Sequence, residues 1–122
     1  MKASERSAQL WAVLAWAARS RQNITYGQLA QVTGAFTGGL GAWLEPIQSY
    51  CIINGLPPLT VLVVQQDSGM PGAGFTGASA GDLAKAQARV FSFNWLEHGN
   101  PGAENLEKAV KQAPSNAGPS GA

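Results

Sequence analysis

The sequence predicts an α+β fold that is mostly helical: a winged helix-turn-helix-like domain with a small antiparallel sheet and an extra C-terminal helix. Three observations favour this fold. Apolar residues recur at helical spacing near the N-terminus, two helix-start signals follow, and the apolar run 60–64 precedes a Gly/Pro-rich segment. The chain of 122 residues suits one domain, which we place at residues 1–112. The low-complexity tail 113–122 is expected to be disordered.

Residues 5–20 are predicted to form the first helix, with Trp16 at the margin of its buried face. The apolar residues that share this face are Leu10, Trp11, Leu14, Ala15 and Ala18. Arg19 and Arg21 close the apolar stretch too early for it to span a membrane. We therefore expect a helix of the mature protein rather than a signal peptide, no membrane partner, and a cytoplasmic location.

Residues 25–45 are predicted to form a helix-turn-helix that contains no strand. Thr25 stands three residues before Gln28, which is the spacing of a capping box, and Gly34 is the expected stop of a helix over 26–33. Thr37 is the expected N-cap of the second helix. Pro46 should begin a further helix that runs to Asn54, since proline interrupts helix hydrogen bonding. That helix would bury Cys51 as a chemically inert core residue.

Residues 60–64 are the expected strand, followed by a turn at 65–69 and a Gly/Pro-rich return at 70–75 that would form the wing. A helix should begin at the capping signal 79–82, with Leu83, Ala86 and Val90 on its buried side. The alternation in residues 91–95 predicts a second short strand that pairs with 60–64. Residues 104–112 are weakly helical in pattern, and His98 is interpreted as a helix-ending residue.

Composition argues against catalysis and against metal or cofactor binding. The chain has one cysteine and one histidine, far apart in sequence, so neither a disulfide framework nor a metal site is expected. The acidic residues form no recognisable catalytic pair, and the segment 69–77 lacks the Lys-Ser/Thr ending of a phosphate-binding loop. A net charge of +1 also excludes a broad positive field, so any contact with nucleic acid must be local.

Three segments carry a resemblance to a known family: TYGQLA at 25–30, LGAWL at 40–44, and NGLP at 54–57 leading into a Val-Val strand. Over about residues 8–75 the chain resembles the winged helix-turn-helix domain of alkylguanine-DNA alkyltransferases and alkyltransferase-like proteins. In that family a tyrosine and the recognition helix grip the DNA backbone, and an arginine finger pushes out the damaged base. A Pro-Cys-His-Arg motif then accepts the alkyl group.

The resemblance implies a retained binding scaffold without the chemistry. Thr25 and Tyr26 stand at the phosphate-contacting turn, whereas Gly38 replaces the arginine finger and Ala42 replaces a second arginine of the recognition helix. Thr60 occupies the position of the acceptor cysteine, and a threonine hydroxyl without an activating base is no substitute for a thiolate. We therefore expect no enzyme activity. The segment 45–53 is extra relative to the family.

The first functional hypothesis is weak, backbone-directed DNA binding. Residues 37–55 contain no Lys or Arg and carry Glu45, so phosphate contacts must come from elsewhere. Lys85 and Arg89 share a helix face, one turn apart. The predicted DNA-contacting residues are Arg19, Arg21, Thr25, Tyr26, Thr37, Lys85 and Arg89.

The alternative hypothesis is a homodimeric protein-interaction or accessory module. Four tryptophans in a chain with 12% charged residues favour a large apolar contact, since aromatic side chains dominate interface energetics. The predicted interface residues are Trp16, Trp43, Phe93 and Trp95. Residues 50–75 and 90–95 are also similar to uncharacterised bacterial proteins of mobile elements such as integron cassettes, which favours an accessory role.

Overall fold

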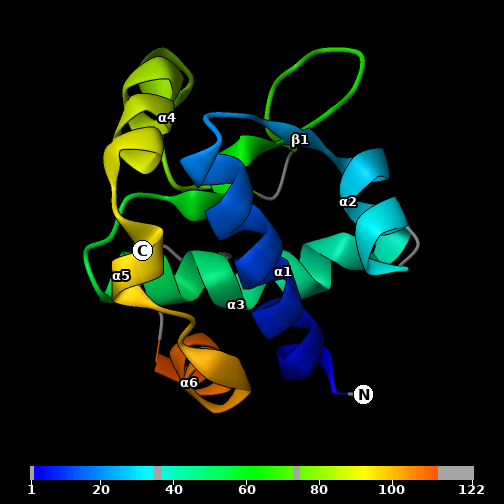
Figure 1. Ribbon diagram of the computed structural model, residues 1–122, viewed down its shortest axis with the longest axis vertical. Helices are drawn as coiled ribbons and strands as arrows, with labels where there is room; N and C mark the ends of the chain where they lie inside the picture. Colours follow the sequence, from blue (N-terminus) through cyan, green and yellow to red (C-terminus); the bar gives the residue numbers. More distant parts are fainter. Residues whose placement is uncertain (1, 35–36, 73–74, 113–122) are drawn as a thin grey trace.

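The structure is a computed structural model that describes residues 2–34, 37–72 and 75–112, and helices make up most of these ranges (Figure 1). The predicted disordered tail, 113–122, lies outside them. The elements are α1 (Ala3–Arg19), β1 (Ile24–Thr25), α2 (Tyr26–Thr33), η1 (Thr37–Gly39), α3 (Leu40–Ile53), η2 (Leu59–Leu62), β2 (Val63–Val64), η3 (Ala80–Asp82), α4 (Leu83–Ser92), α5 (Trp95–His98) and α6 (Gly102–Gln112). A mostly helical α+β chain is therefore confirmed.

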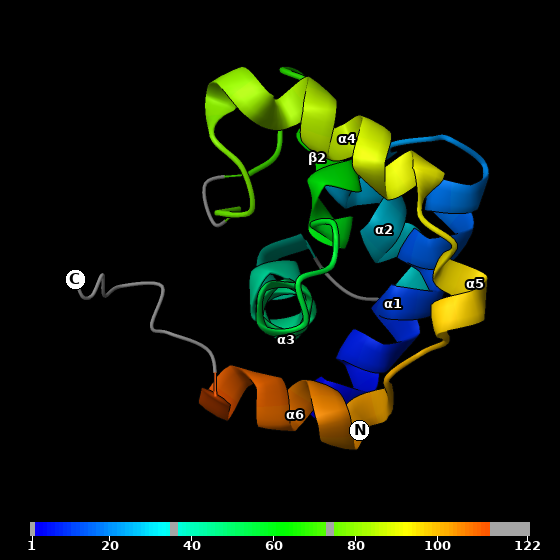
Figure 2. The same cartoon turned by 90° about the vertical axis from the view of Figure 1, so that its left-hand side faces the viewer.

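The core forms where α1 crosses α3, with α6 at one end of the molecule and α4 at the other (Figures 1 and 2). Leu10, Trp11 and Leu14 of α1 are buried, as their spacing predicts. Leu106 and Ala109 bury one face of α6 against α1 and α3, so the weak C-terminal pattern is a well-packed helix.

The predicted helix over 26–33 is confirmed together with both of its end signals. The Thr25 hydroxyl accepts a hydrogen bond from the Gln28 amide at 3.0 Å, and the Thr25 amide donates to Gln28 Oε1 at 2.9 Å. Gly34 ends the helix in the left-handed conformation, with φ 75°. The expectation that this window contains no strand is wrong at Thr25, because the extended N-cap residue also pairs with Val64.

The second helix differs from prediction at both Thr37 and Pro46. Thr37 begins the 3₁₀ turn η1, and Gly39 is the N-cap of α3. α3 then runs through Pro46 without a break. The Ser7 hydroxyl of α1 donates a hydrogen bond to the backbone carbonyl of Trp43, and Pro46 itself is buried. Tertiary packing therefore offsets the local cost of proline inside the helix.

The predicted antiparallel sheet is wrong. Residues 59–62 form the 3₁₀ helix η2, and the remaining strand Val63–Val64 pairs in parallel with Ile24–Thr25. The antiparallel pairing found in the described ranges is a single bridge between Val64 and Pro71. The predicted turn at 65–69 is closed by hydrogen bonds from the Gln65 amide to the Met70 carbonyl and from the Gly69 amide to the Gln65 carbonyl, both 2.8 Å. Residues 73–74 of the expected wing lie outside the described residues.

Residues 91–95 are not a strand. α4 continues to Ser92, and α5 begins at Trp95 after Asn94, whose side chain accepts a hydrogen bond from the Glu97 amide at 3.1 Å. The Trp95 indole donates to the Val90 carbonyl at 2.8 Å, so the chain folds back on α4 instead of extending towards β2. Ala86 and Val90 are buried as predicted, and His98 is the last residue of α5.

Candidate nucleic-acid interface

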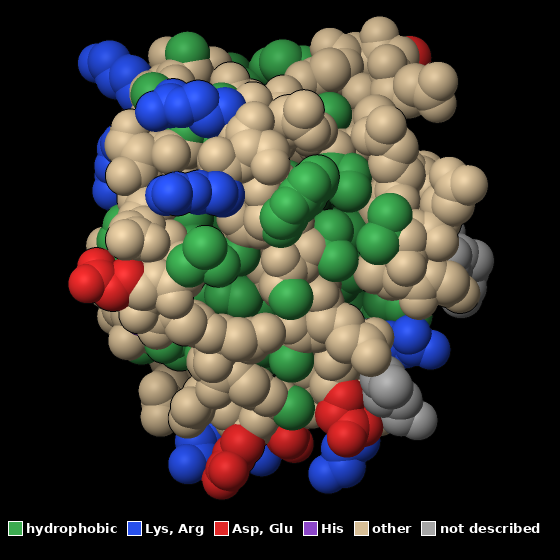
Figure 3. All heavy atoms as spheres, in the orientation of Figure 1, with side chains coloured by type: hydrophobic (Ala, Val, Ile, Leu, Met, Phe, Trp, Pro, Cys, Tyr) green, Lys and Arg blue, Asp and Glu red, His purple; other side chains and the backbone are tan. Residues whose placement is uncertain are grey.

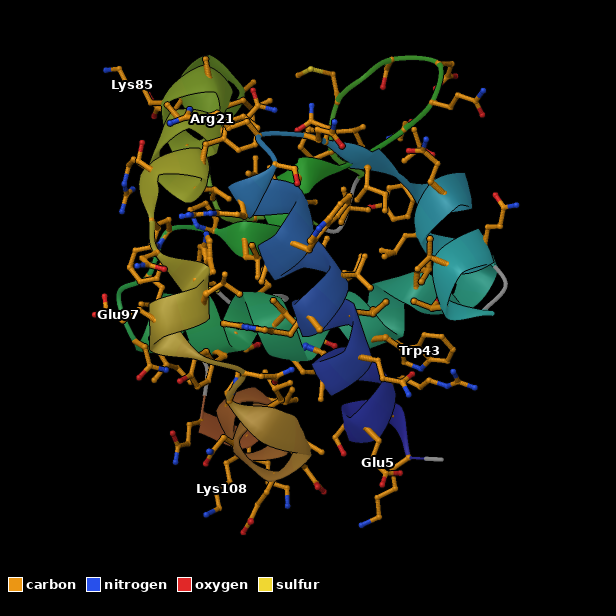
Figure 4. The ribbon with its side chains drawn as sticks, viewed as in Figure 1. Glu5, Arg21, Trp43, Lys85, Glu97 and Lys108 are labelled. Carbon is orange, nitrogen blue, oxygen red and sulfur yellow. The ribbon has the colours of Figure 1, made fainter. Side chains whose placement is uncertain are left out.

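Four exposed cations lie at one end of the molecule: Arg19, Arg21, Lys85 and Arg89, called here the basic cluster. α4 packs against α1, and Gln87 Nε2 donates to Asn23 Oδ1 at 2.5 Å, which joins the two segments that carry these side chains. Figure 4 shows Arg21 and Lys85 at the same upper end, and Figure 3 shows Lys and Arg side chains gathered there. Two cation pairs that are distant in sequence thus lie at one end of the molecule.

Arg21 holds an unusual backbone conformation, since its φ of 56° is left-handed. Its amide donates to the Ala18 carbonyl at 3.0 Å and the Gln22 amide donates to the Ala17 carbonyl at 2.9 Å, which is the bonding pattern of a Schellman motif. Glycine is the usual residue at this position because a Cβ is strained there. The chain therefore carries a cationic side chain where backbone stability alone favours glycine.

Thr25 and Tyr26 lie at the junction between β1 and α2. The Thr25 hydroxyl serves as the helix cap described above. Tyr26 is half-buried, and its hydroxyl lies so close to Gly72 that a Cβ on Gly72 would overlap it. Both side chains thus take part in organising α2 and the loop after β2.

The basic cluster is separated from the connection between α2 and α3. Thr37 lies in that connection, but its side chain is outside the part of the chain that the structure describes. Gly41, Ala42 and Glu45 form the exposed side of the N-terminal half of α3. Figure 4 places Arg21 and Lys85 at the upper left and Trp43 of α3 at the lower right. α3 therefore presents small side chains and one carboxylate in place of basic residues.

Trp16 is the largest hydrophobic side chain on the exposed face of α1, with 64% of its surface accessible. It borders a pocket of about 260 Å³ between α1 and α2. The other residues that line this pocket are Ala17, Gln22, Asn23, Ile24, Gln28, Gln31 and Val32. Figure 3 shows hydrophobic side chains over the middle of this face, with Lys and Arg side chains towards the upper left. Trp16 and its neighbours thus form an apolar surface next to the basic cluster.

The other predicted interface aromatics pack within the chain. Trp95 is 3% exposed, so the expectation of an exposed side chain is wrong, and half-buried Phe93 lies 4.4 Å from it between ring centroids. Trp43 is half-buried, and the Arg6 guanidinium lies 5.5 Å from its ring centroid. Arg6 also donates to the Thr33 carbonyl at 3.2 Å, near the end of α2. Sequence reasoning missed Arg6, because no local pattern signals a partner on another helix.

Thr60 of η2 and Cys51 of α3 are both buried, and η2 packs against α3. The Thr60 hydroxyl has no hydrogen-bond partner among the described residues. Burial raises the pKa of the Cys51 thiol to about 11, although a backbone hydrogen bond at Leu59 acts in the opposite direction. A thiol with that pKa is protonated at neutral pH and is a poor nucleophile. The prediction that Cys51 is buried is confirmed.

Within the described ranges, no three His, Cys, Asp or Glu side chains are grouped closely enough to hold a metal ion, and no helix could cross a membrane. No protein-family model, curated protein or solved structure matches the chain. The geometry of the basic cluster and of the Trp16 surface therefore provides the basis for a functional proposal.

Proposed function

We propose that this chain is a non-catalytic nucleic-acid-binding domain of alkyltransferase-like type, which holds DNA weakly through its phosphate backbone. The observation that carries the proposal is the basic cluster, in which α1 and α4 bring Arg19, Arg21, Lys85 and Arg89 to one end of the molecule. The left-handed backbone of Arg21 adds support, since strained residues concentrate at functional sites.

The order of α1, α2, α3, β2 and a following loop agrees with the element order that the resemblance implies, and this agreement supports the proposed class. α3 itself supplies no cation, so the phosphate contacts come from the basic cluster. Affinity should then be modest, with a shallow salt dependence that corresponds to roughly two to four phosphate contacts. Such contacts fix the position of the protein without reading base sequence.

The absence of alkyl transfer is part of the proposal. Thr60 stands where the resemblance places the acceptor cysteine, and its buried hydroxyl has no hydrogen-bond partner among the described residues, so no base is bonded to it there. Cys51 is unsuited to the role because burial keeps its thiol protonated. The domain should therefore bind DNA and leave it chemically unchanged.

Titration of a fluorescently labelled duplex at low and moderate salt, read by anisotropy, tests the proposal. The double variant Arg19→Ala/Arg21→Ala should weaken binding to all duplex sequences alike. Lys108→Ala/Lys111→Ala removes the same charge from α6, at the opposite end of the molecule, and is the matched control. If no DNA, double- or single-stranded, binds at low salt, where electrostatic attraction is strongest, the proposal is wrong.

A homodimeric interaction module is the second candidate, and the exposed Trp16 surface favours it. This candidate requires a concentration-dependent dimer in sedimentation, which Trp16→Ala should dissociate. It also requires that no duplex binds at low salt. The two candidates therefore predict opposite results for the wild-type protein.

A further inference from the structure

We infer that Trp16 is a stacking platform for an unpaired nucleobase, so that single-stranded nucleic acid is the preferred ligand of this domain. The inference rests on the proposed function, because it places the base beside the proposed phosphate contacts. Proteins that bind single strands combine a basic surface with exposed aromatic side chains on which bases stack. Trp16 and the basic cluster supply both parts on one face.

The position of Trp16 suits stacking. Its side chain is 64% exposed at the edge of the pocket between α1 and α2, and Val32 on the far side of that pocket is 63% exposed. Trp11 and Trp95, by contrast, are buried in the core and packed edge-on against each other. The pocket of about 260 Å³ gives a base an apolar surface to lie against.

The pocket rim carries amide groups that fit the edge of a base. The side-chain oxygens of Gln28 and Asn23 accept hydrogen bonds from the Thr25 amide and from Gln87. Their amide nitrogens donate to no protein group among the described residues, so they remain as donors for base carbonyl and ring-nitrogen acceptors. Gln22 and Gln31 add further amides to the rim.

Charge complementarity identifies the occupant. Arg19 lies three residues after Trp16 on α1, so the two share the exposed face of the helix, and Arg21 follows at the helix end. A base stacked on Trp16 would keep its own backbone phosphates near these cations. A duplex holds its bases paired and offers no free face to Trp16, whereas a single strand does.

A second copy of the chain fits this surface less well. A twofold interface brings the same patch together from both subunits. Centring it on Trp16 would gather Arg19 and Arg21 of both copies around the contact, and like charges across an interface oppose association. A negatively charged strand meets no such opposition.

Anisotropy titrations of a labelled oligothymidine and of a duplex of equal length, at low salt, test the inference. Trp16→Ala should weaken oligothymidine binding by about 5- to 100-fold and change duplex binding by no more than about twofold. Trp16→Phe should retain most of the single-strand affinity, whereas Trp16→Leu, which is apolar but cannot stack, should behave like Trp16→Ala. Leu96→Ala, which removes a 67% exposed side chain from α5, is the control and should change neither affinity.

Each other outcome overturns a specific statement. If both nucleic acids bind and Trp16→Ala affects neither, the stacking role is wrong while the proposed function stands. If neither nucleic acid binds at low salt, the proposed function falls and takes the inference with it. A concentration-dependent dimer that Trp16→Ala dissociates, measured by sedimentation on the same samples, would assign the surface to a second copy of the chain.

Discussion

The Ser7 hydroxyl of α1 donates a hydrogen bond of 2.6 Å to the backbone carbonyl of Trp43 in α3. Ser7 is fully buried, and Trp43 lies three residues before Pro46. Proline supplies no amide hydrogen for the carbonyl four residues earlier, which here is that of Ala42, and its ring crowds the preceding turn, in which Trp43 also lies. A side chain on a neighbouring helix thus supports α3 at its weakest turn.

Ser7→Ala should lower the free energy of unfolding by about 1 to 3 kcal/mol, because it removes a donor from the partly buried carbonyl of Trp43. The measurement is urea denaturation followed by far-ultraviolet circular dichroism. Ser4→Ala, one turn earlier on α1, is the control and should cost less. In the Pro46→Ala variant, Ser7→Ala should lower the free energy of unfolding by less than it does in the wild-type protein. Equal losses in the two proteins would show that the hydrogen bond is unrelated to the proline.

Arg21→Gly should raise the free energy of unfolding by about 1 kcal/mol, since glycine adopts the left-handed conformation without strain. Arg21→Ala keeps a Cβ and removes the same charge, so it should give no such gain. Both variants should weaken binding to nucleic acid equally. Chemical denaturation and duplex titration on the same preparations check this, and equal stabilities of the Gly and Ala variants would contradict it.

Gly72→Ala should lower the free energy of unfolding by about 1 to 3 kcal/mol, because its new methyl group would overlap the hydroxyl end of Tyr26. Removing that hydroxyl creates room, so Tyr26→Phe should recover part of the loss in the double variant. The measurement is the thermal unfolding midpoint of the wild-type protein, the two single variants and the double variant. If the double variant is no more stable than the sum of the two single effects predicts, Gly72 and Tyr26 do not contact each other.

The wild-type protein should lose about 2 kcal/mol of unfolding free energy as the pH rises from about 9 to about 11. In this window the Cys51 thiol ionises in the unfolded chain, whereas burial keeps it protonated in the folded chain until its pKa of about 11. The unfolded state therefore binds fewer protons, and stability falls with increasing pH. Burial also raises the pKa of Tyr50, which acts in the same direction.

Cys51→Ala should flatten this pH dependence, although its stability at neutral pH will be lower because of the cavity it creates. Native Cys51 should also react with a thiol reagent far more slowly than the unfolded chain does. Rapid labelling of the native protein would show that the thiol is accessible and that the pH argument fails.

Local signals predicted some elements accurately. The burial of Leu10 and Leu14 follows from spacing within α1, and Thr25, Gln28 and Gly34 mark the ends of α2. These features depend on residues within a few positions of one another, and a sequence displays them directly.

The errors arose where distant residues override local preference. The sequence around Pro46 gives no sign of the hydrogen bond from Ser7, and the alternation at 91–95 gives no sign of the bond from the Trp95 indole to Val90. The apolar run 60–64 predicts a strand over its whole length, but in the structure only Val63 and Val64 of this run pair with β1. Strand formation depends on a partner, which the run itself does not encode.

The candidate site also combines features that local sequence predicts with features that depend on contacts between distant residues. Arg21 and Lys85 were recognisable as cations outside α3, but their shared surface depends on the packing of α4 against α1. Trp16 was recognisable as a margin residue, whereas the amide-lined pocket beside it required α2 to be placed. Residue types were therefore predictable, and their juxtaposition required the fold.

The parallel pairing of β1 with β2 has a consequence for the order of folding. Residues 26–62 form the closed loop between the two strands, so pairing must await a long chain closure that two-residue strands cannot stabilise alone. The helices within that loop must therefore condense onto α1 first. In pulse-labelling hydrogen exchange, we expect the amides of Val63 and Val64 to gain protection after those of Leu10 and Leu14, as the last structural step before the native state.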